Sequence, residues 1–395
     1  MTKLFNITGK ALSGEWGTDD ENGNGIPVLR TTNFTNEGIV NFDNVVTRTI
    51  TRKNIEEKFL RTGDIIIEKS GGSDKQPVGR VIYYDGPENK YLFNNFTGLL
   101  RIKNQKEWFP RYVFYSLYAN YRKGGTRAFE NKTTGLHNLK IDDYIERYEV
   151  ADANYEKQIS VCYRLDKISD IIEKRKAQLA ALDALVKARF VEMFGDPEIN
   201  TKNWEESKLS EKLEIVGGFA FKSEGFNEFN GIPVLRIGNI NAGFFKPINM
   251  VYWPEDKELE RYIVKPGDLV MSLTGTVGKD DYGNVCVLGN DYTKYYLNQR
   301  NAKLEIKGEL NKYYLAQLLR FEKIKQRLTG ISRGVRQANI SNRDILNLRV
   351  PIPPITLQNE YAAFVAQVDK SKLAIQKSLE KTQLLFDSLM QEYFG

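Results

Sequence analysis

Two segments of the chain repeat apolar residues at heptad spacing. The first runs from about residue 155 to 194, where no Pro or Gly interrupts the sequence, and the second occupies 355–395. Heptad spacing predicts long amphipathic helices, each roughly 60 Å long, that pack on each other as a coiled coil, most simply antiparallel. The expected seam residues are Leu165, Ile168, Ile172, Leu179, Leu182, Val186, Val365, Val368, Ile375, Leu379, Phe386 and Leu389.

Charged residues interrupt both stripes. Arg175 and Lys372 stand at seam positions whose counterparts in the other stripe, Ile375 and Ile172, are apolar. Polar residues in a seam cost stability and specify register. We therefore expect these two charges to pair across the seam or to fix its register.

The rest of the chain has a different pattern. Up to about residue 150, short runs rich in β-branched residues, such as IPVLR from Ile26 and GDIIIEK from Gly63, are separated by Gly, Asn, Asp and Pro. One helix is expected around WFPRYVFYSLYANY, from Trp108. Short strands broken by turn residues, with a single helix among them, predict a mixed α/β domain.

The chain also contains an internal repeat. GIPVLR occurs at 25–30 and again at 231–236, the Gly-Asp turn of 63–64 returns at 267–268, and the two copies end with EMFG and EYFG. Self-similarity over so long a period indicates a tandem duplication. The predicted fold is α+β, with two mixed α/β domains in a tandem pseudo-two-fold repeat, separated by two long helices. The expected boundaries are 1–154 for the first domain, 155–195 for the first helix, 196–354 for the second domain and 355–395 for the second helix.

The composition shows a mild excess of basic residues, and the two cysteines fit a protein of a reducing compartment. The 395 residues include 57 Lys and Arg against 51 Asp and Glu, which suits an anionic partner without demanding one. Cys162 and Cys286 are far apart and form no CxxC pair. The N-terminus shows no signal-peptide core and no apolar run long enough to cross a membrane. We expect a cytoplasmic protein without membrane partners.

Candidate catalytic chemistry is sparse. The single histidine, His137, excludes a Ser-His-Asp triad and a His-based metal cluster, so we predict no catalytic and no metal-binding residues. Asp64, Glu68 and Lys69 could belong to a metal-dependent nuclease, although Ser272 and Leu273 replace the last two in the second copy. A metal-dependent nucleic-acid enzyme built on these three residues, and a structural coiled-coil adaptor with inert globular ends, remain as alternatives.

The loops between the strands carry the residue types that contact nucleic acid. They are dense in Arg, Lys, Asn, Gln, Ser, Thr and Gly, and they differ between copies whose strands agree. Such side chains contact phosphates and read base edges. The predicted DNA-binding residues are Arg30, Thr31, Asn33, Lys69, Ser70, Lys75, Gln76, Arg122, Lys123, Arg127, Lys132, Thr133, His137, Asn138, Arg236, Asn239, Thr274, Thr276, Lys279, Arg300, Arg333, Arg336, Gln337 and Asn339.

Taken together, the order of these segments resembles the specificity (S) subunit of type I restriction-modification systems. The resemblance covers essentially the whole chain and rests on GIPVLR with its following Asn, the Gly-Asp turn, SRGVRQANI from Ser332, and VPIPPITLQ from Val350, which leads into the second helix. Two departures occur in the first copy. Ala153-Asn154 replace the Pro-Pro pair, although Gln158 is kept, and His137-Asn138 stand where the second copy has Arg336-Gln337.

The resemblance implies a non-catalytic subunit with two target-recognition domains. Each domain would read one half of a split double-stranded DNA site, with half-site centres about one helical turn apart. The chain itself would bind no cofactor. Two modification (methyltransferase) subunits would bind S-adenosylmethionine and methylate adenine, and restriction (motor and endonuclease) subunits would use ATP and Mg²⁺ for cleavage.

Overall fold

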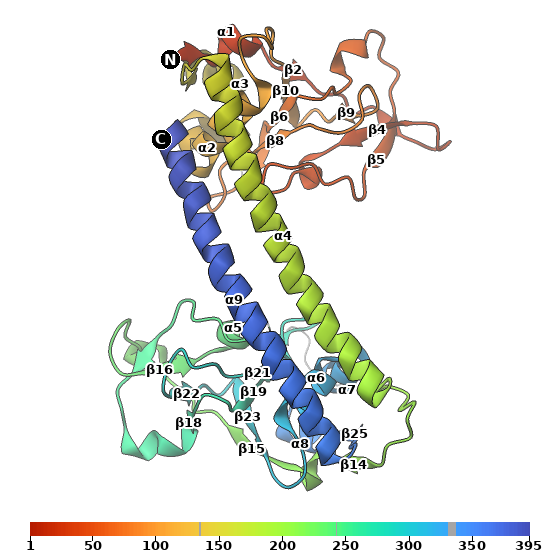
Figure 1. Ribbon diagram of the computed structural model, residues 1–395, viewed down its shortest axis with the longest axis vertical. Helices are drawn as coiled ribbons and strands as arrows, with labels where there is room; N and C mark the ends of the chain where they lie inside the picture. Colours follow the sequence, from red (N-terminus) through yellow and green to blue (C-terminus); the bar gives the residue numbers. More distant parts are fainter. Residues whose placement is uncertain (134–135, 242, 331–336) are drawn as a thin grey trace. The chain divides into compact units, whose positions relative to one another are not determined.

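The computed structural model describes residues 1–133, 136–241, 243–330 and 337–395. It divides into two compact units, one formed by Met1–Lys176 with Lys377–Gly395 and the other by Ala177–Gln376. Each unit combines small sheets with helices (Figure 1). The mixed α/β composition predicted from the strand and turn pattern is confirmed.

The first unit is built on two four-stranded sheets. One has the order β2-β10-β6-β8 and is antiparallel, and the other has the order β3-β5-β4-β9. The strands are β2 (Leu12–Ser13), β3 (Thr18–Asp19), β4 (Ile26–Leu29), β5 (Val46–Thr49), β6 (Ile65–Glu68), β8 (Val81–Tyr83), β9 (Leu92–Phe93) and β10 (Thr97–Leu100). β1 (Thr2–Lys3) pairs with β13 (Glu149–Val150), and the helices are α1 (Leu4–Thr8), α2 (Pro110–Arg122) and α3 (Ile141–Arg147).

The second unit repeats this plan. Its sheets have the orders β15-β23-β19-β21 and β17-β16-β22-β18. The strands are β15 (Leu213–Gly217), β16 (Ile232–Leu235), β17 (Tyr252–Trp253), β18 (Ile263–Val264), β19 (Leu269–Ser272), β21 (Val285–Val287), β22 (Tyr295–Leu297) and β23 (Asn301–Ile306). β14 (Glu206–Lys208) pairs with β25 (Arg349–Pro351), and the helices are α5 (Ile237–Ile240), α6 (Lys312–Arg320), α7 (Glu322–Thr329) and α8 (Asn342–Asn347).

The repeated GIPVLR text forms a buried strand in each unit. It gives β4 and β16, and each of these pairs in parallel with one neighbour, β9 or β22. Val28, Leu29, Val234 and Leu235 have no exposed surface. The repeat is conserved within the chain at these positions because the strand packs inside the core of both units.

The two heptad segments form the helices α4 (Tyr155–Phe194) and α9 (Ile355–Phe394). Gly195 follows α4 with a φ of 78°, the left-handed conformation that ends many helices and that glycine adopts without strain. No helix in the described part of the chain is long and apolar enough to cross a membrane.

Parts of α4 and α9 pack antiparallel within each unit, which confirms the predicted coiled coil. In the first unit Arg164 donates to the hydroxyl of Tyr393 at 3.1 Å, and eleven residues later Arg175 donates to the carbonyl of Ser378 at 2.9 Å. In the second unit the ammonium of Lys372 lies 2.5 Å from the carboxylate of Asp183. The polar residues of the seam therefore bond across it in both units.

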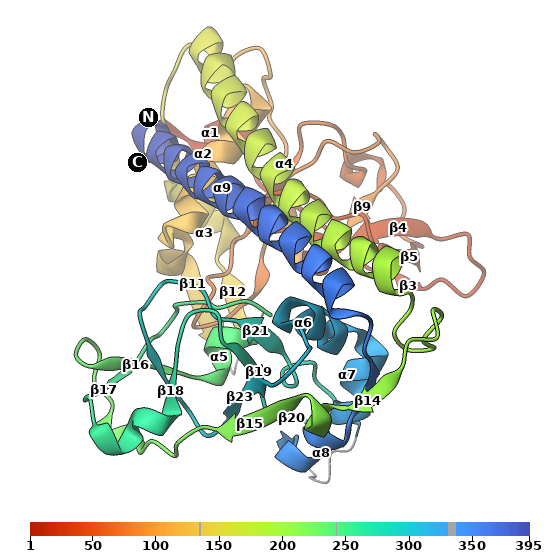
Figure 2. The ribbon, with the colours of Figure 1, turned by 60° about the horizontal axis from the view of Figure 1, so that its bottom comes forward.

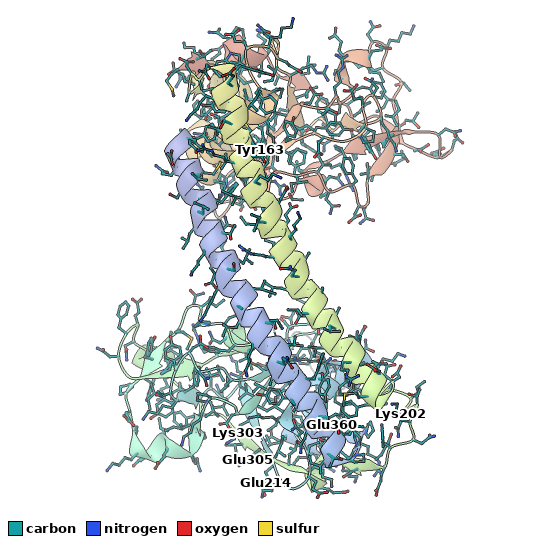
Figure 3. The ribbon with its side chains drawn as sticks, in the orientation of Figure 1. Tyr163, Lys202, Glu214, Lys303, Glu305 and Glu360 are labelled. Carbon is teal, nitrogen blue, oxygen red and sulfur yellow. The ribbon has the colours of Figure 1, made fainter. Side chains whose placement is uncertain are left out.

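The predicted seam residues lie on the packed faces of these helices. Leu165, Ile172, Val365, Val368 and Phe386 are buried. Half-buried positions are Ile168, Leu179, Leu182, Val186, Ile375, Leu379 and Leu389. In contrast, Tyr163 of α4, labelled in Figure 3, is 63% exposed.

Candidate nucleic-acid interface

In the first unit, polar segments that are distant in sequence meet in a three-stranded sheet. β7 (Ser70–Gly72) pairs with β12 (Leu136–Leu139), which pairs with β11 (Glu130–Thr133). Asn138 stands opposite Ser70, and His137 opposite Gly72. Residues 70–72, 130–133 and 136–139, which belong to the loops predicted to contact DNA, therefore form one ribbon.

The second unit assembles its polar loops in a similar way. β20 (Thr274–Thr276) pairs with β24 (Gln337–Asn339), so that Thr274 lies opposite Asn339 and Thr276 opposite Gln337. A tight loop follows β20, in which the carboxylate of Asp281 accepts hydrogen bonds from the backbone N–H and the hydroxyl of Thr276, at 2.8 and 2.9 Å. These bonds, the backbone one foremost, hold the pKa of Asp281 below its usual value.

The predicted contact residues differ in their exposure. Exposed side chains are those of Lys75, Gln76, Arg122, Lys123, Arg127, Thr276, Lys279, Arg300 and Asn339. Half-buried residues are Arg30, Thr31, Lys69, Ser70, Asn138, Arg236 and Thr274. Lys132, Thr133 and Gln337 are placed by their backbone strands only, and Arg333 and Arg336 lie outside the described residues.

Asn33 and Asn239 are buried and hold the loops that follow the repeated strands. Both are 2% exposed. The side-chain oxygen of Asn33 accepts from the N–H of Arg30 at 2.9 Å, and that of Asn239 accepts from the N–H of Arg236 at 3.0 Å. Their amide groups donate to carbonyls across the loop, including that of Asn41 at 3.0 Å. We correct the expectation for these two asparagines, which belong to the loop frame and not to the surface that could touch DNA.

His137 is also buried. Its Nδ1 lies 3.0 Å from the carboxylate of Glu130, and the second oxygen of Glu130 accepts from the N–H of Val78 at 3.0 Å. The histidine side chain is 7% exposed and that of Glu130 is 4% exposed. This pair ties the ribbon to the loop that precedes β8, so His137 supports the ribbon from within.

Arg122 and Lys123 lie against the end of α9. Arg122 forms an ion pair with Asp387 at 2.7 Å, and Lys123 donates to the carbonyl of Phe394 at 3.2 Å. Both side chains are exposed, yet their partners belong to the helix and not to the ribbon. Arg127, by contrast, donates to the carbonyl of Asp74 in the loop after β7, at 3.1 Å.

The three residues of the enzyme alternative have separate partners. Both oxygens of Asp64 accept from Arg101, at 2.8 and 2.6 Å, while the Lys69 ammonium donates to the Ser13 hydroxyl at 3.1 Å. Asp64 precedes β6 and Glu68 ends it, which separates them by roughly 13 Å along an extended strand. Among the described residues no three His, Cys, Asp or Glu side chains gather as a metal site. This geometry does not favour a shared catalytic centre.

Arg80 is a structural residue that the sequence patterns did not single out. It donates to the carbonyls of Phe34 and Thr31, at 3.1 and 2.9 Å, and lies 3.5 Å from Glu68. Burial raises the pKa of Glu68, against the attraction of Arg80, and burial also lowers the pKa of Lys69. The sequence did contain a signal for Arg80: Glu68 is a carboxylate in an otherwise apolar strand, and a buried carboxylate requires a cationic partner.

One charged sheet face is already neutralised. Lys303 lies 3.4 Å from Asp268 and 3.3 Å from Glu305, and Glu214 forms an ion pair with Lys307. Glu214 lies on β15, Lys303 and Glu305 lie on β23, Lys307 follows β23 and Asp268 precedes β19. Figure 3 shows Glu214, Lys303 and Glu305 close together in the second unit. This face offers no cationic excess, so the β20-β24 ribbon remains the better candidate for contact with DNA.

Comparison with known proteins identifies consistent relatives. A family model described as "Type I restriction modification DNA specificity domain" matches residues 201–384. The type I restriction enzyme MjaVIII specificity subunit of Methanocaldococcus jannaschii is 26% identical over 331 residues, which is 76% of this chain and 76% of that protein. Two solved structures match over the whole length of this chain.

The first is the crystal structure of the type I restriction-modification system S subunit from M. genitalium. It has a TM-score of 0.57 and 16% identity, and the match covers 95% of that chain. The second, titled as the structural basis of complex assembly and conformational transition of the type I R-M system, has a TM-score of 0.52 and 15% identity, with 96% of that chain covered. At these identities the structures show a shared fold.

Proposed function

Since the chain belongs to the family of type I restriction-modification specificity subunits, we propose that each globular domain reads one half of a bipartite double-stranded DNA site. The observation that carries this proposal is the polar ribbon in each unit, β11-β12-β7 in one and β20-β24 in the other, on a strand plan common to both. A common frame with different polar loops suits two readers of different short sequences. Phosphate contacts by Lys and Arg would position DNA, and Asn, Gln and Thr would contact base edges.

Exchange of residues 203–349 for the matching domain of another specificity subunit tests the two-reader model. The exchange should change one half-site of the methylated sequence and leave the other intact, because each domain is proposed to read independently. Methylome sequencing of cells that express the exchanged chain with its modification subunit gives the result. An unchanged site would favour the coiled-coil adaptor, and changes in both half-sites would contradict independent reading.

We further propose that α4 and α9 dock two modification subunits, which would bind S-adenosylmethionine, and that restriction subunits with ATP and Mg²⁺ complete the complex. Apolar side chains on the outer faces of both helices support this, since Leu185 is 47% exposed and Leu385 is 51% exposed. A second, exposed apolar face on a helix whose seam is already packed indicates an interaction surface. The chain itself is proposed to bind no cofactor.

A charge in the seam should loosen the helix pair and its docking surface. Leu379→Asp places a carboxylate at a half-buried seam position of the first unit, and we expect it to lower the free energy of unfolding by about 1–2 kcal/mol. Ser388→Asp, which introduces the same carboxylate at an exposed polar position of the same helix, is the matched control and should change little. Denaturant titration and gel filtration with the modification subunit measure both effects. Equal behaviour of the two variants would contradict the seam assignment.

A further inference from the structure

The second unit contains a groove of about 1060 Å³. Its walls come from α4, α6, α7 and α9 and from the loops near residues 243 and 280; Figure 2 shows the four helices together in this unit. Val186, Val287 and Val365 contribute apolar surface to the lining. Ion pairs accompany it, Lys372 with Asp183 and Lys325 with Asp280.

The corresponding helices of the two units can be matched residue by residue. Tyr112 of α2 donates its hydroxyl to the carbonyl of Ala151 at 3.2 Å, and Tyr314 of α6 donates to that of Pro351 at 2.7 Å. In both units the acceptor lies a few residues before the long helix. Tyr112 and Tyr314 therefore occupy equivalent positions, which fixes the register of the remaining pairs along α2 and α6.

In the first unit, aromatic rings fill the space beside α2. Phe114, Tyr115 and Tyr118 are 1%, 2% and 7% exposed. The Phe114 ring stacks on Tyr118 at 5.5 Å between centroids and lies 5.3 Å from Tyr115 and 5.7 Å from Tyr83. Four rings from a helix and a strand thus form a continuous packed layer.

In the second unit the matching residues are small, aliphatic or polar. In the register fixed above, Ala316 replaces Phe114, Gln317 replaces Tyr115 and Arg320 replaces Tyr118, and all three line the groove. The strand partner changes in the same direction, because Val287 stands opposite Leu269 where Tyr83 stands opposite Ile65. The groove therefore lies where the duplicated fold has lost a layer of rings.

The second unit has other rings, and some of them, such as that of Tyr361, border the groove without filling it. Phe190, Phe194, Tyr314 and Tyr361 pack on one another, with centroids 4.8 to 5.5 Å apart. None of them stands at the positions of Phe114, Tyr115 and Tyr118. Protein interiors are close-packed, and a space this large within a fold that fills it elsewhere points to an external occupant.

We infer that the groove receives aromatic side chains from a segment of the modification subunit. The same space is filled by aromatic side chains in the first unit, which gives the chemistry of the occupant. Five cationic and four anionic side chains line the groove, so it has no marked preference for a polyanion. Phe244, also in the lining, is 58% exposed and extends the apolar surface toward solvent. An apolar centre with charged groups around it is typical of a protein interface.

This inference rests on the proposed assembly function, and a groove-filling variant tests it. Ala316→Phe combined with Gln317→Tyr restores two of the missing rings from within the chain. We expect the variant to melt no lower than the parent and to bind the purified modification subunit roughly tenfold or more weakly, since buried aromatic contacts dominate interface energies. Gln317→Tyr alone serves if the double variant does not fold. Glu214→Tyr adds a ring at an exposed position of β15, outside the lining and away from α4 and α9, and should leave binding unchanged (Figure 3).

A crosslinking experiment identifies the occupant directly. A benzophenone amino acid at position 316 of the full chain should crosslink, in the assembled complex, to a modification-subunit peptide that contains Phe, Tyr or Trp. Parental affinity of the folded filled variant, or a crosslink at position 316 to no partner peptide, would overturn the inference. Either result would leave the proposed function standing, which fails separately if the parent chain does not bind the modification subunit at all.

Discussion

Replacement of Asp64 by alanine should lower the free energy of unfolding of the first unit by about 3–5 kcal/mol, because it removes one partner of a buried ion pair. The Asp64 carboxylate is 2% exposed and accepts two hydrogen bonds from Arg101, at 2.8 and 2.6 Å. Arg101 is itself held by the carbonyls of Glu57 and Phe59, at 2.7 and 2.9 Å. The guanidinium cannot rotate out into solvent without losing these hydrogen bonds. Its charge would therefore remain largely buried and unpaired.

The duplication supplies the control for this prediction. Asp268 occupies the same turn and accepts from the N–H of Lys265 at 2.8 Å, as Asp64 accepts from Arg61 at 2.8 Å. Its cation is a lysine, Lys303, 3.4 Å away, and the Asp268 side chain is 24% exposed. Asp268→Ala should therefore lower the free energy of unfolding of the second unit by only about 1 kcal/mol, close to the contribution of one hydrogen bond in the turn.

Hydrogen exchange measures the two losses separately, since it reports local opening peptide by peptide. Peptides that cover β6 and β10 report on Asp64→Ala, and peptides that cover β19 and β23 report on Asp268→Ala. The first pair should exchange much faster in its variant than the second pair does. Similar acceleration in both units would mean that the turn bond, and not the arginine, carries the stability at this position.

The long helices and the repeat were predictable because both rest on periodic patterns. A heptad stripe needs no knowledge of distant contacts, and positions such as Leu165 and Val365 follow from spacing alone. The polar seam residue Arg175 was also expected to bond across the helix pair, and it bonds to Ser378. These features are local in sequence, or they recur, and either property makes them visible without a structure.

The candidate DNA-binding residues were less accessible from sequence because their residue types serve two purposes. Asn33 and Lys75 look alike in a polar loop, yet Asn33 is 2% exposed and bonds backbone groups, while Lys75 is exposed. An asparagine can cap a loop or read a base, and only the fold decides between the two uses. The pairing of β7 with β12 was similarly hidden, because strands so distant in sequence carry no mutual periodicity.

The groove depends on a difference between the two copies that could not be interpreted from the sequence. The repeat suggested that its two copies differ only in their loops, whereas Phe114 and Ala316 differ within the packed layer beside the long helix. A change from a ring to a methyl group appears in the sequence as ordinary divergence. Its meaning depends on whether neighbouring residues refill the space, and Tyr83 is matched by the smaller Val287, which does not refill it.

Replacement of either buried glutamine at the start of a long helix should lower the free energy of unfolding of the unit concerned by about 3 kcal/mol. Gln158 and Gln358 are 1% and 0% exposed. Each accepts a hydrogen bond at 2.8 Å from the N–H that precedes the domain helix, of Phe109 in one unit and Asn311 in the other. Methionine has nearly the same shape but only a weakly accepting thioether sulfur, so Gln158→Met and Gln358→Met would leave that buried N–H without a strong acceptor.

The hydrogen bonds donated by the two side-chain NH2 groups predict which substitution lowers the free energy of unfolding more. Gln158 donates to the carbonyls of Glu107 and Ala153, both at 2.9 Å, and Gln358 donates to that of Pro353 at 2.7 Å. Gln158→Met therefore strands one more carbonyl and should be the more destabilising variant. Hydrogen exchange of the first turns of α4 and α9 measures both losses, with the exposed Gln178→Met as the control. A loss no greater than that of Gln178→Met would mean that the packing of the long helices, and not these amides, fixes where each helix leaves its domain.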